Sequence, residues 1–328
     1  MLLPIARLRP WVAIFVLASP GFACPGFAQA APEHALESIY RTGANEVQLT
    51  FSATDENNHG MATLQASDFA VVDKERVVRN FRSFHRVDFT RLDVAVLIDS
   101  SESVASSYRQ ETASTLRLIS QMDGIPAGSF SVVSFHGAEP AILCAGKCRA
   151  FPLAEQLAGV HAGGLTPLFD GVVFASDFLS RSQPSNGEGS RASDFRVRRV
   201  LIIFSDGDDT ISVHSAADAM KAALENDVQV YAVDTGEPTH PGAGSAFLRT
   251  LAQVTGGRSL AMKQGAVALV GAILEDFHAT YTVSYQLPSR VPGFHPVRIL
   301  PASNSHLQFR CRSGYYYPGN TSPDAFGN

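Results

Sequence analysis

Residues 93–103 read DVAVLIDSSES, an apolar run that ends in a cluster of acidic and hydroxyl side chains. Residues 93–98 are almost continuously apolar, which is typical of a strand covered on both faces. Similar runs recur at residues 131–135, 200–204 and 228–233. Segments with helical periodicity alternate with these runs or follow them, at 108–121, 167–179, 216–225, 246–255 and 266–277. This order predicts an α/β fold, in which a Rossmann-like, doubly wound, mostly parallel sheet carries helices on both faces.

The segments on either side of this region have the alternating residue pattern of β-strands. Val47, Leu49 and Phe51 alternate with polar residues, and further strand-like runs lie before residue 88. After the last predicted helix, strand texture returns at 281–286, 296–300 and 307–311. Neither set has enough apolar material for a core of its own, so we expect the two sets to form one small β-sandwich-like domain.

Oxygen-bearing side chains gather where the predicted strands end. Asp99, Ser101 and Ser103 follow the first strand, and their spacing by two places three oxygens on one tight loop. Thr166 lies just before a predicted helix, and Asp206 follows the strand at 200–204. Because the carboxyl ends of parallel strands meet at one edge of the sheet, these donors can converge. Carboxylate and hydroxyl oxygens suit Mg²⁺, Mn²⁺ or Ca²⁺. In the alternative interpretation, Ser101 or Ser103 only caps the following helix.

These motifs give the chain a resemblance to a known family. The Asp-x-Ser-x-Ser pattern of 99–103, the threonine of TPLFD at 166–170 and the SDG at 205–207 are similar to the von Willebrand factor type A domain with its metal-ion-dependent adhesion site. The flanking stretches LQASDFAV at 64–71 and RCRSGYY at 310–316 resemble the exported bacterial "VWFA-related acidobacterial" group. The resemblance implies that the metal ligands are Asp99, Ser101, Ser103, Thr166 and Asp206, with Mg²⁺ favoured over Mn²⁺ or Ca²⁺.

The resemblance, together with the sequence patterns and the charges of the candidate ligands, implies a function and a division of the chain. An open position on the cation favours an anionic oxygen, so we expect a non-enzymatic adhesion module that binds an Asp or Glu carboxylate of a partner protein. The expected divisions are a signal peptide, an N-terminal β-rich segment, the type A domain and a C-terminal β segment, at 1–30, 31–90, 91–280 and 281–328.

Two other functions compete with this interpretation. Asp206-x-Asp208-x-Thr210 after an apolar strand matches the pattern of haloacid-dehalogenase-type phosphatases, with one aspartate as nucleophile and the next as acid/base. Ser205 breaks the apolar run where such enzymes have a hydrophobic residue, and no matching acidic metal motif follows. The other alternative is a scaffold protein with a vestigial metal site. In that case the tyrosines at 315–317 would contact the partner through their aromatic rings. The competing interpretation of these tyrosines is that they pack within a strand.

The N-terminus has the order of a secretory signal peptide. Arg7 and Arg9 precede the apolar stretch at 11–18, and small residues follow up to Ala30. The apolar stretch is too short to span a bilayer, and no later stretch reaches transmembrane length. We therefore expect export to the periplasm, the cell surface or the medium. A lipoprotein cut before Cys24, which would anchor the chain to a lipid, is the alternative.

Composition and cysteines narrow the function further. The 328 residues are 45% hydrophobic with a net charge of -5, which excludes extensive disorder and argues against nucleic-acid binding. Loss of residues 1–30 would remove two arginines and no acid, bringing the net charge to -7. Cys144 and Cys148 lie in a Gly-containing loop, and a local disulfide suits an exported chain better than a zinc site, which needs four ligands. Cys311 would then remain unpaired or pair between chains.

Overall fold

The computed structural model describes eight stretches of the chain: residues 40–41, 45–87, 91–122, 128–137, 139–181, 197–236, 242–302 and 306–318. The predicted signal peptide, Cys24 and most of the polar loop at 180–194 lie outside them.

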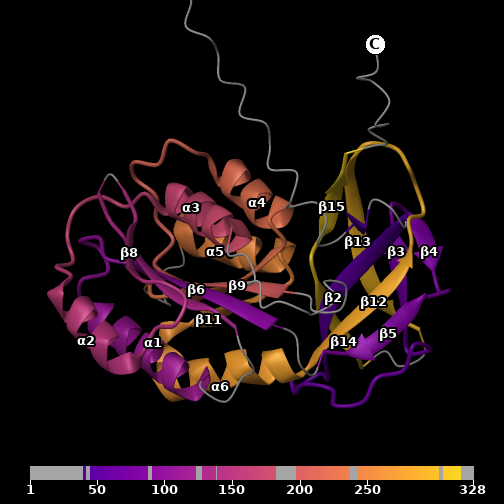
Figure 1. The fold of residues 1–328 in the computed structure, drawn as a ribbon, viewed down its shortest axis with the longest axis horizontal. Helices are drawn as coiled ribbons and strands as arrows, with labels where there is room; N and C mark the ends of the chain where they lie inside the picture. Colours follow the sequence, from indigo (N-terminus) through magenta and orange to yellow (C-terminus); the bar gives the residue numbers. More distant parts are fainter. Residues whose placement is uncertain are drawn as a thin grey trace, which may run out of the picture. The chain divides into compact units, whose positions relative to one another are not determined.

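A six-stranded sheet forms the centre of the α/β region (Figure 1). Its strands, in spatial order, are β11 (Arg258–Ala261), β10 (Val228–Asp234), β9 (Val197–Ser205), β6 (Arg91–Asp99), β7 (Phe130–Phe135) and β8 (Ala141–Cys144). All neighbours pair in parallel except β7 and β8, which are antiparallel. The predicted mostly parallel sheet is therefore confirmed.

Helices cover both faces of this sheet, as the apolar strands require. One face packs against α1 (Tyr108–Met122), α2 (Ala150–Gly159) and α6 (Gly265–His278), and the other against α3 (Leu168–Arg181), α4 (Ala216–Glu225) and α5 (Ala243–Val254) (Figure 1). Alternate residues of β6 supply the two cores: Val94, Val96 and Ile98 on one side, Ala95 and Leu97 on the other. A 3₁₀ turn at Met262–Gln264 precedes α6.

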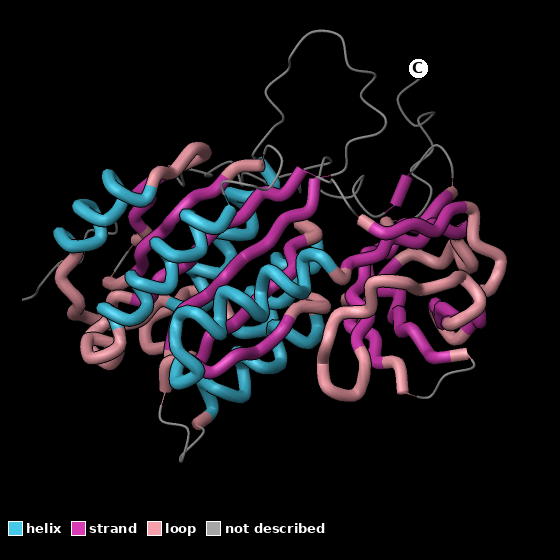
Figure 2. The backbone as a smooth tube through the Cα atoms, turned by 90° about the horizontal axis from the view of Figure 1, so that it is seen from below, coloured by secondary structure: helices cyan, strands magenta, loops and turns pink. Residues whose placement is uncertain are grey.

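The N-terminal and C-terminal strands form two antiparallel sheets, which lie beside the α/β region in Figure 2. The first sheet contains β1 (Tyr40–Arg41), β2 (Glu46–Thr54), β12 (Thr280–Gln286), β5 (Ser83–Arg86) and β14 (Gln308–Cys311). The second contains β15 (Gly314–Tyr317), β13 (Gly293–Pro301), β3 (Phe69–Asp73) and β4 (Arg76–Val78). Both sheets contribute to one apolar core, so the predicted sandwich-like arrangement of both chain ends is confirmed.

The tyrosine run at 315–317 belongs to this core. Tyr315 and Tyr317 are buried in β15, which confirms strand packing for these residues. The hydroxyls of Tyr285 and Tyr315 both donate to Oδ2 of buried Asp73, at 2.9 Å. Burial raises the pKa of the Asp73 carboxyl, although these hydroxyls lower it in part. Buried His295 lies beside the same carboxylate, with 3.8 Å from Nδ1 to Asp73 Oδ1, so this histidine has a structural role.

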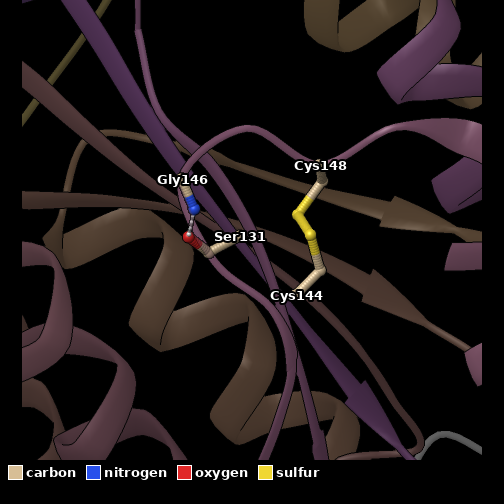
Figure 3. The surroundings of a disulfide bond; sticks show 4 residues. All are labelled: Ser131, Cys144, Gly146 and Cys148. Atoms are coloured by element: carbon tan, nitrogen blue, oxygen red, sulfur yellow. Dashed lines mark hydrogen bonds between the residues drawn. A yellow bond between two sulfur atoms is a disulfide. The ribbon is translucent and has the colours of Figure 1, made fainter. Parts of the chain in front are cut away.

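The sequence interpretation did not predict strands β8 and β11 or helix α2. Strand β8 and the turn after it hold the disulfide between Cys144 and Cys148, which confirms the predicted pairing (Figure 3). In this turn, the amide of Gly146 donates to the hydroxyl of Ser131 on β7 at 3.1 Å. Cys311 is a free, partly buried thiol whose pKa burial raises to about 11, so it is unreactive near neutral pH.

Buried charge joins the β-sheets to the α/β region. The guanidinium of Arg312 is buried and donates to Asp227 Oδ1 at 2.5 Å, to the carbonyl of Gly314 at 2.7 Å and to the carbonyl of Leu224. Gly256 has a φ of +77°, and a Cβ there would lie 2.6 Å from the Arg312 amide nitrogen. These contacts require the two backbones to approach closely.

Among the helices of the described stretches, none combines the length and the apolar character that a membrane span needs.

Candidate metal centre

The predicted ligands lie where the order of the central sheet reverses. From β6 the chain goes to β7 on one side and later returns through β9 on the other. Asp99 is the last residue of β6 and Ser205 the last residue of β9, so both carboxyl ends meet at this point. Ligand sites of doubly wound sheets form at such switch points.

The first loop is built around the Asp99 carboxylate, which is fully buried. Oδ1 accepts the amide of Ser101 at 2.9 Å, and Oδ2 accepts the hydroxyl of Ser205 at 2.7 Å. The hydroxyls of Ser101 and Ser103 lie 3.2 Å apart, with Ser101 buried and Ser103 exposed. The side chains of 99, 101 and 103 therefore gather in one place, as the spacing predicted.

Neither serine caps the next helix. Helix α1 begins at Tyr108, five residues beyond Ser103, and the hydroxyl of Ser107 donates to Glu111 Oε1 at 2.6 Å within its first turn. The alternative in which Ser101 or Ser103 is only a helix cap is thus wrong. Ser100 is also buried, but its hydroxyl bonds to Ser134 Oγ and to His136 Nδ1 at the end of β7.

The second loop is tied to the first by backbone hydrogen bonds. The amide of Gly163 donates to the carbonyl of Ser100 at 2.8 Å, and the amide of Glu102 donates to the carbonyl of Gly164 at 3.2 Å. Thr166, at the end of this loop, is 4% exposed. Glu102 itself is exposed, so its carboxylate is not enclosed in the site.

The third loop is tied to the second by a reciprocal pair of hydrogen bonds. The amide of Thr166 donates to the hydroxyl of Thr210, and the amide of Thr210 donates to the carbonyl of Thr166, both at 2.8 Å. Asp209 accepts the amide of Phe169 at 3.1 Å, in the first turn of α3. Asp170 accepts the amides of Val213 and His214. Asp209 and Asp170 therefore connect this loop to α3.

Gly207 shows how closely the third loop is packed. Its φ is +85°, and a Cβ there would lie 2.3 Å from the carbonyl carbon of Gly244 at the start of α5. Its amide donates to the hydroxyl of Ser205 at 3.0 Å, while Asp206 is partly exposed and accepts the amide of Asp208 at 3.1 Å. The glycine lets the chain turn tightly between Ser205 and the acidic loop.

Acidic groups accumulate at this edge. Burial raises the pKa of the Asp99 carboxyl, and the charge of Asp206 raises it further, while hydrogen bonds from Ser101 and Ser205 lower it in part. Behind them, Glu111 on α1 is fully buried, and Oε2 has no hydrogen-bond partner within the described stretches. Burial raises the pKa of Glu111 to about 8, and the charges of Asp99 and Asp206 add to the effect.

This donor set fits a hard divalent cation. It contains two carboxylates that repel each other and hydroxyl oxygens that carry no charge, and a cation between the carboxylates would relieve the repulsion. The described residues contain no group of three or more His, Cys, Asp or Glu side chains able to hold a metal. A cation here would therefore depend on serine and threonine oxygens.

Two contributors to this edge were not predicted as such. Ser205 appeared in the SDG motif and as a break in an apolar strand, with no role of its own, yet its hydroxyl connects β9 to the Asp99 carboxylate. A polar residue at the end of a fully buried strand was the available signal. No signal in the sequence marked the role of Glu111, because a glutamate in the first turn of a helix is common.

The phosphatase alternative has weak support from this geometry. Asp208, its proposed acid/base, is exposed, and only its amide contacts Asp206. That interpretation also leaves unexplained why Ser205 and Asp206 lie against Asp99.

One family model and several solved structures are similar to this chain. The model of the von Willebrand factor type A domain family matches residues 93–264. A search of the curated proteins found no match. Among solved structures, a von Willebrand factor type A protein from Catenulispora acidiphila is 11% identical, with 86% of this chain and 76% of that chain covered and a TM-score of 0.44.

The mussel byssus protein PTMP1, in a structure with a zinc-occupied MIDAS motif, is 17% identical, with 56% of this chain and 48% of that chain covered and a TM-score of 0.43. The SpRpn10 VWA domain is 13% identical, with 55% of this chain and 94% of that chain covered and a TM-score of 0.41. The chain thus spans about half the length of the mussel protein.

Proposed function

Because the chain belongs to the von Willebrand factor type A domain family, whose members are typically non-catalytic binding modules, we propose that it binds an acidic partner protein through a divalent cation. The cation is held by Asp99, Ser101, Ser103, Thr166 and Asp206, and Mg²⁺ is the preferred ion. The observation that carries the proposal is the hydrogen bond from Ser205 to Asp99 at the switch point, beside the repelling carboxylate of Asp206.

Different residues orient the Asp99 carboxylate and hold the loops of this site in place. The Ser101 amide and the Ser205 hydroxyl each occupy one lone pair of the Asp99 carboxylate and so hold it in one orientation. The reciprocal bonds between Thr166 and Thr210 hold the second and third loops in register. When bound, the cation supplies an electrophilic position for an incoming oxygen. Because the hydroxyl ligands are neutral, that position retains affinity for a partner's Asp or Glu carboxylate.

Titration calorimetry of the mature protein with MgCl₂ and MnCl₂ tests the metal site. We expect binding by the wild type and its loss in Asp99→Ala. Asp208→Ala is the matched control, because this acid lies on the same loop with an exposed side chain and should leave binding unchanged. Absence of binding to the wild type, or intact binding in Asp99→Ala, would contradict the proposal.

A pull-down from the native secretome tests the partner. Bait protein is compared in Mg²⁺ and in EDTA, and wild type is compared with Asp99→Ala. We expect a captured protein that is lost in both EDTA and the variant. Metal binding without metal-dependent capture would instead favour the scaffold with a vestigial site.

We also propose that the chain is exported. The disulfide between Cys144 and Cys148 supports this, since such bonds persist in oxidising compartments. Mass spectrometry of the protein from its native cell should find a mature N-terminus after Ala30. A lipid-modified N-terminus at Cys24 would establish anchoring instead, and an intact Met1 on a cytosolic protein would rule out export.

A further inference from the structure

A second site lies where the α/β region meets the flanking β-sheets. A cavity of ≈ 640 Å³ opens there, within the range of small-molecule binding sites. Its walls come from α5 and β11 on one side and from β13 and β14 on the other. It shares no residue with the predicted metal ligands.

The cavity is strongly cationic. Four arginines line it, Arg249 on α5, Arg258 on β11, Arg298 on β13 and Arg310 on β14, and none of the described residues that line it is acidic. The whole chain has a net charge of -5, so this concentration of guanidinium groups runs against the composition. We call it the arginine cavity.

Structural ion pairs explain only part of this charge. Asp276 is buried on α6, and its Oδ1 lies 2.6 Å from a guanidinium nitrogen of Arg310 and 3.7 Å from one of Arg258. One carboxylate therefore pairs with two guanidiniums. Arg310 Nε is buried and has no hydrogen-bond partner among the residues described. Arg298 lies 3.7 Å from Glu75, but their side chains are 63% and 82% exposed, and such pairs are weak.

Apolar groups share the cavity with the arginines. Val254, Val297, Ile299 and Phe309 contribute to its lining, next to the polar side chain of Gln253. Gln253 lies one helical turn after Arg249, so both face the cavity from the same side of α5. Val297 and Ile299 are buried in the core between the two β-sheets, so an occupant can place charge on the guanidiniums and an apolar body against half-buried Val254 and Phe309.

We propose that the arginine cavity binds a small molecule with two or more anionic oxygen-bearing groups, carboxylate or phosphate, on an apolar body. Guanidinium groups pair with such oxyanions through two parallel hydrogen bonds, and they are weakly hydrated, so they suit a partly enclosed site. Because residues from both the α/β region and the β-sheets line the cavity, an occupant bridges them and stabilises their contact.

Calorimetric titration with pyrophosphate and with citrate, both into protein freed of divalent cations on a chelating resin, tests the proposal with phosphate and carboxylate probes. The resin removes divalent cations without leaving a soluble polycarboxylate that would compete for the cavity, so the result does not depend on the metal centre. We expect binding of at least one probe that weakens as salt is added. In Arg249→Gln/Arg298→Gln we expect at least about tenfold weaker binding, because charge-assisted hydrogen bonds are lost.

The matched control is Arg117→Gln/Arg181→Gln, which removes the same charge from exposed positions on α1 and α3 that do not line the cavity. It should bind as the wild type does. Should the double variant unfold, Arg249→Gln alone tests an exposed helix position. Failure of both probes to bind the wild type, or equal binding by wild type and cavity variants, would overturn the proposal.

Discussion

The chain concentrates opposite charges in two regions on and beside one α/β sheet. At the carboxyl edge of the sheet, burial and the charge of Asp206 raise the pKa of Asp99, burial and the charges of Asp99 and Asp206 raise the pKa of Glu111, and the remaining donors are neutral hydroxyls. The arginine cavity is lined by guanidiniums from four elements, and two of them, Arg258 and Arg310, pair with one buried carboxylate, Asp276. Each region holds an excess of one charge, and the two proposed ligands have opposite signs.

The two regions differ in how the chain assembles them. The carboxyl edge is made of loops that each follow a buried strand or precede a helix, so the topology of a doubly wound sheet brings them together. The arginine cavity requires β13 and β14 to dock on α5 and β11, which depends on contacts far apart in sequence. The first is therefore a property of the fold, and the second is a property of how two parts of the molecule pack.

The largest effect is expected from the buried arginine beside the cavity. Arg312→Met would leave Asp227 and the carbonyls of Gly314 and Leu224 without their donor. We expect the free energy of unfolding to fall by about 3–5 kcal/mol, as for broken buried ion pairs. Urea denaturation measures it. A loss no larger than that of the exposed Arg117→Met would show that this contact is not a structural clamp.

The second prediction concerns pH at the carboxyl edge. In the unfolded chain Glu111 titrates near its ordinary value of 4.5, whereas in the folded protein its pKa is about 8. The folded state therefore holds an extra proton between these values, and this group makes stability fall as pH rises through that window. Glu111→Gln removes the ionisable group. In EDTA at pH 9 it should be more stable than the wild type by several kcal/mol.

The same pair of proteins should have nearly equal stability at pH 4, where Glu111 is neutral in both states. Thermal melts across pH 4–9 provide the comparison. An identical pH dependence for wild type and Glu111→Gln would show that burial and the nearby acids do not hold Glu111 protonated, and the proposed accumulation of acidic groups at the carboxyl edge would be wrong.

The third prediction tests how precisely the third loop must be placed. In Gly207→Ala the new Cβ meets the backbone of Gly244, and the positive φ adds strain. We expect a loss of about 2–3 kcal/mol of stability, with weaker Mg²⁺ binding because Asp206 is displaced. Gly159→Ala is the control, since its Cβ meets nothing within 4 Å. Calorimetry should find pyrophosphate binding in the arginine cavity unchanged.

The smallest effect is expected at a position that belongs to neither region. Cys144→Ser/Cys148→Ser removes the disulfide after β8, which closes a short loop, so we expect a loss of about 2 kcal/mol. Differential scanning calorimetry measures the stability. Mg²⁺ and pyrophosphate binding should both survive; loss of either would mean that β8 supports that site from a distance.

Much of the fold could be predicted from local pattern. The apolar strand at 93–98 and the helical periodicity at 266–277 correspond to β6 and α6. Helix α2 was missed because its disulfide-linked neighbourhood reads as a loop, and Phe151 on it is 76% exposed. Strand β11 has only four residues, too few to show a period.

The sequence predicted the candidate ligand residues of the metal centre, but not the hydrogen bonds that hold their loops in place. The spacing of Asp99, Ser101 and Ser103 is local, so the convergence of their side chains could be inferred without a structure. The pairing of Thr166 with Thr210 spans 44 residues, and no pattern in the sequence marks it.

By itself, the sequence determined the class of sheet, the pairing of chain ends in one β-sandwich, the disulfide and a set of hard oxygen donors, because each rests on periodicity or short spacing. Only the tertiary structure decided that Ser205 holds Asp99, that Glu111 lies buried behind it and that four arginines from distant elements share one cavity. The physical reason is that burial and the mutual pKa effects of charges depend on what packs beside a residue, and packing joins segments that are far apart along the chain.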